Sequence, residues 1–123
     1  MNKRNKAIRK CINEREILYH YLDKPIEFEC VYRCCKQVFD EGYVGKSMLF
    51  TDIQLKQLGG HYIQHIWIHT DNINNLDEHY LKTGTRLRCI GTPYEYIHLL
   101  RGKPMNFKYS LKDVQIIEVI EWV

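Results

Sequence analysis

The sequence lacks a long apolar run, and this absence bounds where the protein acts. No stretch approaches the roughly 18 apolar residues that a membrane-spanning helix requires. The basic start, Met1 to Lys6, is followed by charged residues rather than by the apolar core of a secretory signal. The cysteines are five, an odd number, which favours free thiols over a disulfide framework. We therefore expect a cytoplasmic protein without a membrane partner.

Catalytic motifs are also missing. The chain has two serines, Ser47 and Ser110, and neither lies in a nucleophile elbow. Gly45, Lys46 and Ser47 match the end of a phosphate-binding loop, but Asp40 occupies the position that the first glycine of that motif requires. We expect no enzyme activity and no catalytic residues.

Histidines and cysteines are spaced poorly for a metal site. The histidines of segment 61–69 are four residues apart, in a stretch whose Tyr, Ile and Trp content favours a strand. Residues four apart on a strand are separated by about 13 Å, whereas zinc–nitrogen bonds are about 2 Å long. The spacing of Cys30, Cys34 and Cys35 is not that of a zinc knuckle either. A metal would need further ligands from neighbouring strands, and we expect none, nor any other cofactor.

Composition indicates one small globular domain. The chain has 123 residues, of which 45% are hydrophobic and 27% charged. The net charge of +3 permits nucleic-acid or acidic protein partners without requiring them. Five of the first ten residues are Lys or Arg, which form either a solubilising face or an arm that contacts phosphates. Nine tyrosines suit both strands and interaction surfaces.

Periodicity predicts one helix followed by a strand-rich domain. Apolar residues recur near every 3.6 positions over 5–22, which predicts a helix that ends before Pro25. A polar run, 70–79, is long enough for a short helix. Alternating or β-rich runs predict five strands, over residues 26–39, 48–55, 62–70, 85–97 and 107–119, the last broken between 111 and 114. We expect a helical extension, 1–25, and one domain, 26–123.

Glycines and alternation add local detail. The pair Gly59-Gly60 predicts a hairpin turn between the second and third strands, and Gly91-Thr92-Pro93 predicts a bulge or an edge in the fourth. Alternation along the first strand places Cys30 and Cys34 on the apolar face and Cys35 on the other. We therefore expect Cys30 and Cys34 to be buried, with Cys35 more exposed.

Four stretches carry a family resemblance. They are Leu49-Phe50-Thr51-Asp52-Ile53, Ile66-Trp67-Ile68, Leu81-Lys82-Thr83-Gly84-Thr85-Arg86-Leu87 and Val114-Gln115-Ile116-Ile117. With the predicted strand order, they resemble the OB-fold family over roughly residues 26–120. The resemblance implies a mainly β fold, a small five-stranded barrel with an outer N-terminal helix and a short helix between strands three and four. His65-Ile66-Trp67 also resembles small OB-like proteins of phages and mobile elements of Gram-positive bacteria.

A basic and aromatic face is the candidate site. If Ile66 and Ile68 point inward, their neighbours on the third strand point outward, and the arginines of the fourth strand do the same when Leu87 and Cys89 are inward. Aromatic rings stack on bases, and arginines neutralise phosphates. The candidate binding residues are Arg33, His65, Trp67, His69, Arg86, Arg88 and Tyr94.

A structural role for the same residues is also open. Trp67 is able to cover an end of the barrel, and the arginines are able to pair with Glu27 and Glu29. The OB resemblance and this face together predict a non-enzymatic module that binds single-stranded DNA or RNA. The alternative is a protein-binding inhibitor of a host nucleic-acid enzyme, as anti-CRISPR proteins are. The sequence leaves the oligomeric state open.

Overall fold

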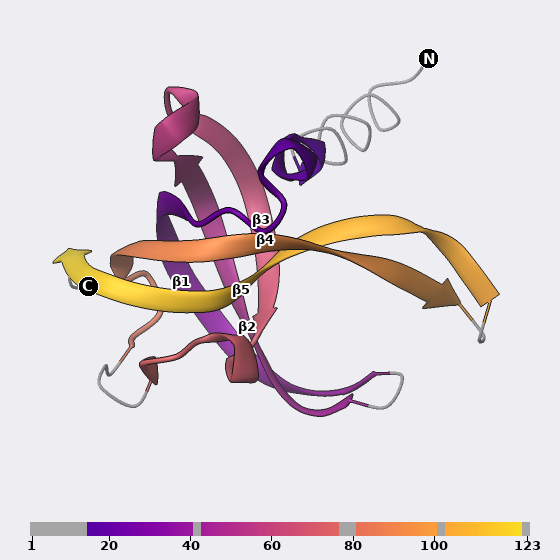
Figure 1. Ribbon diagram of the computed structural model, residues 1–123. Coiled ribbons are helices and arrows are strands. Elements are labelled where there is room, and N and C mark those ends of the chain that lie inside the picture. Colours follow the sequence, from indigo (N-terminus) through magenta and orange to yellow (C-terminus); the bar gives the residue numbers. More distant parts are fainter. Residues whose placement is uncertain (1–14, 41–42, 77–80, 101–102, 122–123) are drawn as a thin grey trace, which may run out of the picture.

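The computed structural model describes residues 15–40, 43–76, 81–100 and 103–121, and five antiparallel strands in one sheet dominate it (Figure 1). The strands are β1 (Ile26–Asp40), β2 (Tyr43–Leu55), β3 (His61–His69), β4 (Arg86–Leu100) and β5 (Lys103–Glu121). Short 3-10 turns accompany them, namely η1 (Ile17–Tyr21), η2 (Lys56–Leu58) and η3 (Thr70–Asn72). The expectation of a mainly β fold is confirmed. No helix in these ranges is long and apolar enough to cross a bilayer.

Strand β1 lies at the centre of the sheet, whose order is β3-β2-β1-β4-β5. It pairs with β4 only from Ile26 to Val31, whereas its pairing with β2 continues to Asp40. Beyond the pairing of Ser47 with His69 of β3, β1 and β2 continue as a two-stranded ribbon, and the β1–β2 arm (36–47) is this ribbon together with the residue pair at its base. Strands β4 and β5 continue past Gly91 as a second ribbon, the β4–β5 arm (92–112). Both arms project toward the same side of the molecule (Figure 1).

The ends of the sheet, β3 and β5, approach each other just after η3. Ile73 forms an isolated parallel bridge with Val114, and the N–H of Asn74 donates to the carbonyl of Val114 at 2.8 Å. The buried side chain of Asn75 donates to the carbonyl of Ile116 at 2.8 Å and accepts from its N–H at 2.9 Å. In the described residues no ladder joins β3 to β5, so the sheet is not closed into a barrel.

These contacts also explain why the helix expected over 70–79 is not seen in its described part. The turn η3 ends at Asn72, and the backbone of Ile73 and Asn74 then bonds to β5 instead of continuing a helix. The helix expected over 5–22 is described from residue 15, where Ile17–Tyr21 forms the 3-10 turn η1. Residues 1–14 and 77–80 lie outside the described part.

One hydrophobic core covers the inner face of the sheet. Leu18 of η1 is fully buried in it, so this turn packs on the sheet. The inward positions expected for Ile66, Ile68, Leu87 and Cys89 are confirmed, since each is at most 1% exposed. Apolar residues at every second position thus place one face of each strand inside and leave the other for solvent.

Glycine and aspartate mark the irregular points of the sheet. The hairpin predicted at Gly59-Gly60 is confirmed, with Leu55 opposite His61 and positive φ at both glycines. The bulge predicted at 91–93 is present as a register shift between Ile90 and Thr92. Strand β5 is continuous rather than broken, because Asp113, with φ of +50°, absorbs the irregularity opposite that shift.

Candidate functional site

Two bulges shape the outer face of β1 and β2. Arg33 is an extra residue on β1, because Tyr32 lies opposite Phe50 while Cys34 lies opposite the very next residue, Leu49. On β2, Asp52 and its neighbour together oppose a single residue of β1. Asp52 has a φ of +52°, a left-handed conformation that Asp adopts more readily than most residues. The bulges turn Arg33 and Asp52 toward the same patch of surface.

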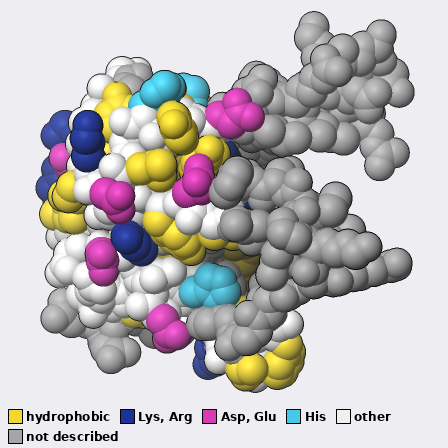
Figure 2. All heavy atoms as spheres, turned by 45° about the vertical axis from the view of Figure 1, so that its right-hand side comes forward, with side chains coloured by type: hydrophobic (Ala, Val, Ile, Leu, Met, Phe, Trp, Pro, Cys, Tyr) yellow, Lys and Arg dark blue, Asp and Glu magenta, His cyan; other side chains and the backbone are white. Residues whose placement is uncertain are grey.

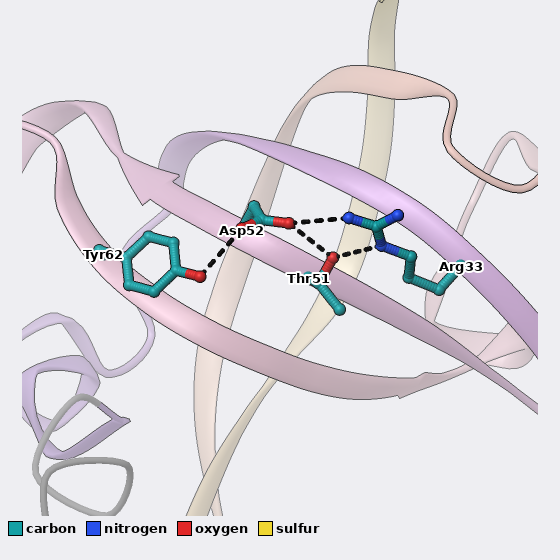
Figure 3. A network of polar contacts seen from close by, with 4 residues as sticks. All are labelled: Arg33, Thr51, Asp52 and Tyr62. Carbon is teal, nitrogen blue, oxygen red and sulfur yellow. Dashed lines mark hydrogen bonds and ion pairs between the residues drawn. The ribbon is translucent and has the colours of Figure 1, made fainter. Parts of the chain in front are cut away.

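A polar network joins these bulges to β3 (Figure 3). The guanidinium of Arg33 lies 3.0 Å from Oδ2 of Asp52, and its Nε donates to the hydroxyl of Thr51 at 2.7 Å. Thr51 in turn donates to Oδ2 of Asp52 at 2.9 Å, and Tyr62 donates to Oδ1 at 2.9 Å. Each of these four side chains is therefore held in place by at least one other.

The same bonds set the charge of Asp52. Hydrogen bonds from Tyr62 and Thr51, together with the nearby Arg33, hold the pKa of the Asp52 carboxyl below its ordinary value of 3.8, against the opposing effect of burial. Asp52 is therefore a carboxylate at neutral pH, where it only accepts hydrogen bonds.

A shallow hollow of about 520 Å³ lies over this network. It extends across the outer face of β1, β2 and β3, and its lining includes Arg33, Thr51, Asp52, Tyr62, His65 and Trp67. Of the residues predicted from the sequence, the hollow brings together Arg33, His65 and Trp67. Thr51, Asp52 and Tyr62 were not predicted.

A change of phase along β3 explains why Tyr62 was missed. Strict alternation from the buried Ile66 places even-numbered residues inside, but Ile63 is the buried residue at the start of the strand. Gln64 and His65 consequently both line the hollow, and Tyr62 joins them. The sequence does carry a sign of this change of phase: Ile63 is odd-numbered, whereas the apolar residues that follow it, Ile66 and Ile68, are even-numbered.

Trp67 receives a cation from the β1–β2 arm. The ammonium of Lys36 lies 5.0 Å from the centroid of the indole, within the range of a cation–π contact. The backbone of β3 is bonded here as well, since Ser110 of β5 donates to the carbonyl of Trp67 at 3.2 Å and Arg15 donates to the carbonyl of His65 at 2.9 Å. Lys36 was not predicted, because its distance from Trp67 depends on the register of three strands.

The other predicted residues lie elsewhere. Arg88 is on β4, and its Nε lies 3.2 Å from a carboxylate oxygen of Glu118 and 3.6 Å from one of Glu27. The structural role considered above, in which an arginine pairs with Glu27, is therefore present for Arg88. Arg86, opposite Val31, and His69, opposite Ser47, are not among the lining residues.

Tyr94 is not among the lining residues either and lies on the β4–β5 arm. Its ring centroid lies 5.9 Å from that of Tyr96. Burial raises the pKa of the Tyr94 phenol, and hydrogen bonds with Ser110 and Asn72 act in the opposite direction. Tyr94 and Tyr96 thus form a second aromatic pair, on β4.

The cysteines depart from the prediction at one position. Cys30 and Cys89 are buried and unpaired, while Cys34 and Cys35 are both exposed. The prediction that Cys34 is buried is wrong, because the bulge at Arg33 shifts the phase of β1 where the strand leaves the core. The contact with Cys89 and burial raise the pKa of the Cys30 thiol. Within the described ranges, no group of three or more His, Cys, Asp or Glu side chains is placed to hold a metal ion.

Surface charge is mixed rather than segregated. On the face in Figure 2, basic and acidic side chains are interspersed among hydrophobic ones. Several cations pair with carboxylates, as Lys56 does with Glu27 at 3.2 Å and Lys112 with Asp23 at 3.7 Å. Attraction for an anion must therefore come from local groups such as Lys36.

Comparisons of the chain with protein-family models, curated proteins and solved structures gave no match.

Proposed function

We propose that this protein is a non-enzymatic module that binds single-stranded DNA or RNA in the hollow on β1, β2 and β3. The observation that carries the proposal is one hollow with two aromatic rings, Trp67 and Tyr62, beside the guanidinium of Arg33 and the ammonium of Lys36. Stacking of a base on an aromatic ring contributes about 1–3 kcal/mol, and cations offset phosphate charge.

The strand arrangement supports an OB-like fold for this module. The OB-fold is a partly open five-stranded Greek-key barrel that binds oligonucleotides on the face of strands 2 and 3 and through its 1–2 and 4–5 loops. Here the hollow lies largely on β2 and β3, and the two arms are the 1–2 and 4–5 connections. We propose that the approach of Ile73 to Val114 is the remnant of barrel closure.

The chemistry of the hollow favours binding over catalysis. A general base works best with a pKa near the operating pH. The pKa of Asp52 lies below 3.8, and its oxygens already accept bonds from Arg33, Thr51 and Tyr62. These groups are arranged to keep a fixed shape and charge, which suits a recognition surface.

Fluorescence anisotropy with labelled oligothymidylate and oligouridylate at low salt tests the proposal. Trp67→Leu should weaken binding by about 1–3 kcal/mol, whereas Trp67→Phe, which keeps an aromatic ring, should retain most of the affinity. Thermal melts of each variant separate lost stacking from lost folding. Undetectable binding of the wild-type protein to both oligonucleotides would refute the function.

A second candidate function, an inhibitor that binds a nucleic-acid enzyme, is favoured by one observation. Phe39 and Val44 lie opposite each other on the β1–β2 arm and are 75% and 70% exposed. Exposed apolar groups of this kind mark protein-interaction sites. Pull-down from a lysate with and without nuclease, repeated with Phe39→Ser/Val44→Ser, distinguishes the two. A nuclease-resistant partner lost in that variant, with no binding of free oligonucleotides, favours the inhibitor. Either function is consistent with a cytoplasmic location, where Cys34 and Cys35 stay reduced.

A further inference from the structure

The hollow has two unlike walls, and their charges indicate the path of a bound strand, provided that the proposed function holds. The β1 wall carries the cation Arg33, and Lys36, also on β1, places its ammonium over the ring of Trp67. Strand β3 contains no Lys, Arg, Asp or Glu, and its wall presents Tyr62 and Trp67. Between the walls lies the carboxylate of Asp52 on β2. The hollow is thus cationic along one strand and aromatic along another.

Phosphates are directed to the β1 wall by this arrangement. The Asp52 carboxylate repels a phosphate placed over β2, and its ion pair with Arg33 at 3.0 Å already offsets much of that cation. Lys36 differs, because among the described side chains no carboxylate forms an ion pair with it. Its ammonium lies over Trp67, where a base would stack.

We propose that a bound single strand of nucleic acid runs along the hollow in the direction of the β-strands. Its phosphates then lie along β1 at Lys36 and its bases over β3, and it does not cross the sheet onto β4. When a base stacks on Trp67, the ammonium of Lys36 leaves the ring and contacts the phosphate of that nucleotide. The cation–π contact of the free protein is therefore exchanged for stacking plus a phosphate contact.

The crossing path is disfavoured by the charges on β4. A nucleic-acid strand that crossed the sheet from β3 over β1 would reach Arg86 and Arg88 of β4, which lie opposite Val31 and Glu29. Arg88 is held between the carboxylates of Glu27 and Glu118, so a phosphate on this path would compete with two carboxylates for its guanidinium. Lys36 offers its charge without such a cost.

Salt titrations of matched variants, each of which replaces one cationic side chain by glutamine, test the path. An oligothymidylate of about ten nucleotides is bound to wild-type protein, Lys36→Gln, Arg86→Gln and Arg88→Gln between about 50 and 200 mM salt. Lys36→Gln should make the slope of log K against log salt shallower by about 0.7, so that its affinity falls about 2.6-fold less over this range. Arg86→Gln and Arg88→Gln should keep the wild-type slope. Reduced slopes in both β4 variants with an unchanged slope for Lys36→Gln would overturn the lengthwise path.

The exchange at Trp67 has its own signature. Removing Lys36 loses a phosphate contact but frees the indole face, so Lys36→Gln should bind more weakly at low salt and reach or exceed wild-type affinity at high salt. Indole emission in a Trp122→Phe background should also differ between free wild-type protein and Lys36→Gln. If the plots of log K against log salt for wild-type protein and Lys36→Gln are parallel, and the indole emission of the two free proteins is identical, then Lys36 does not exchange the ring of Trp67 for a phosphate. Failure of wild-type protein to bind the oligonucleotide refutes the proposed function itself, whereas binding with β4-dependent slopes refutes only the path.

Discussion

Arg33 and Asp52 belong to bulges on adjacent strands, and their side chains meet at 3.0 Å. Each bulge alone disturbs the pairing of β1 with β2, but each also aims its charged side chain at the other. Thr51 lies between them and bonds to both. The two irregularities are thereby fixed relative to each other, and they set the shape of the hollow.

The first prediction concerns the acid sensitivity of this network. The folded-state pKa of Asp52 lies below its ordinary value of 3.8, so its contribution is present above about pH 4 and is lost as pH falls through the folded-state pKa. In urea unfolding at a series of pH values, Asp52→Asn should be less stable than wild type at neutral pH, and the difference should shrink below about pH 4. Asparagine is chosen because it tolerates positive φ. A gap for Asp52→Asn that does not depend on pH contradicts the prediction.

The second prediction concerns the contact between the sheet ends. Asn75→Ala leaves the buried N–H and carbonyl of Ile116 without their partner, at about 1–3 kcal/mol for each group, so the free energy of unfolding should fall by about 2–6 kcal/mol. Asn74→Ala is the matched control, because the bond from Asn74 to Val114 is made by its backbone. Chemical denaturation measures both. Equal, small effects of the two substitutions would show that the Asn75 side chain does not hold β5 in place.

The third prediction concerns Gly91, where β4 approaches the core. A Cβ there would lie 3.1 Å from Cγ2 of Val114 and 3.3 Å from Cε1 of Phe28, both of them buried side chains. Gly91→Ala should destabilise the fold by about 1–3 kcal/mol through overpacking. Val114→Ala removes one of the two contacts, so the double variant should lose less stability than the sum of the single variants. Strict additivity in thermal or chemical unfolding argues against overpacking at this position.

The fourth prediction concerns thiol reactivity. In a Cys11→Ser background, Cys34 and Cys35 should react rapidly with a thiol reagent in the native state, because both are exposed on β1. Cys30 and Cys89 should react only upon unfolding, since both are buried and the pKa of Cys30 is raised. Mass spectrometry of the labelled protein identifies the sites. Fast native labelling of Cys30 would indicate that β1 and β4 separate readily.

Alternation of apolar residues was sufficient to predict five strands and most of the core. It predicted that Ile66, Ile68 and Leu87 are inside, because a regular strand repeats every two residues. It failed at Cys34, where one inserted residue reverses the faces. A bulge depends on pairing with a second strand, and a single sequence does not show where that pairing slips.

The candidate site was predicted only in part for the same reason. His65 and Trp67 follow from their position between buried isoleucines, and Arg33 from its outward position on β1. Asp52 and Lys36 come from other strands, and their contacts with Arg33 and Trp67 are set by register. The sequence shows which residues carry charge or rings, but the hollow arises from which strands lie side by side.

The bonds from Arg15 to the carbonyl of His65 and from Ser110 to that of Trp67 have a consequence for self-association. Strand β3 is at one end of the sheet, and a row of unpaired carbonyls there is a template for strand addition by another copy and hence for aggregation. These donors occupy two such carbonyls beside the hollow. With these two carbonyls already bonded, the backbone of β3 has fewer acceptors for strand addition by a neighbouring chain, while the side chains of β3 remain accessible to a ligand.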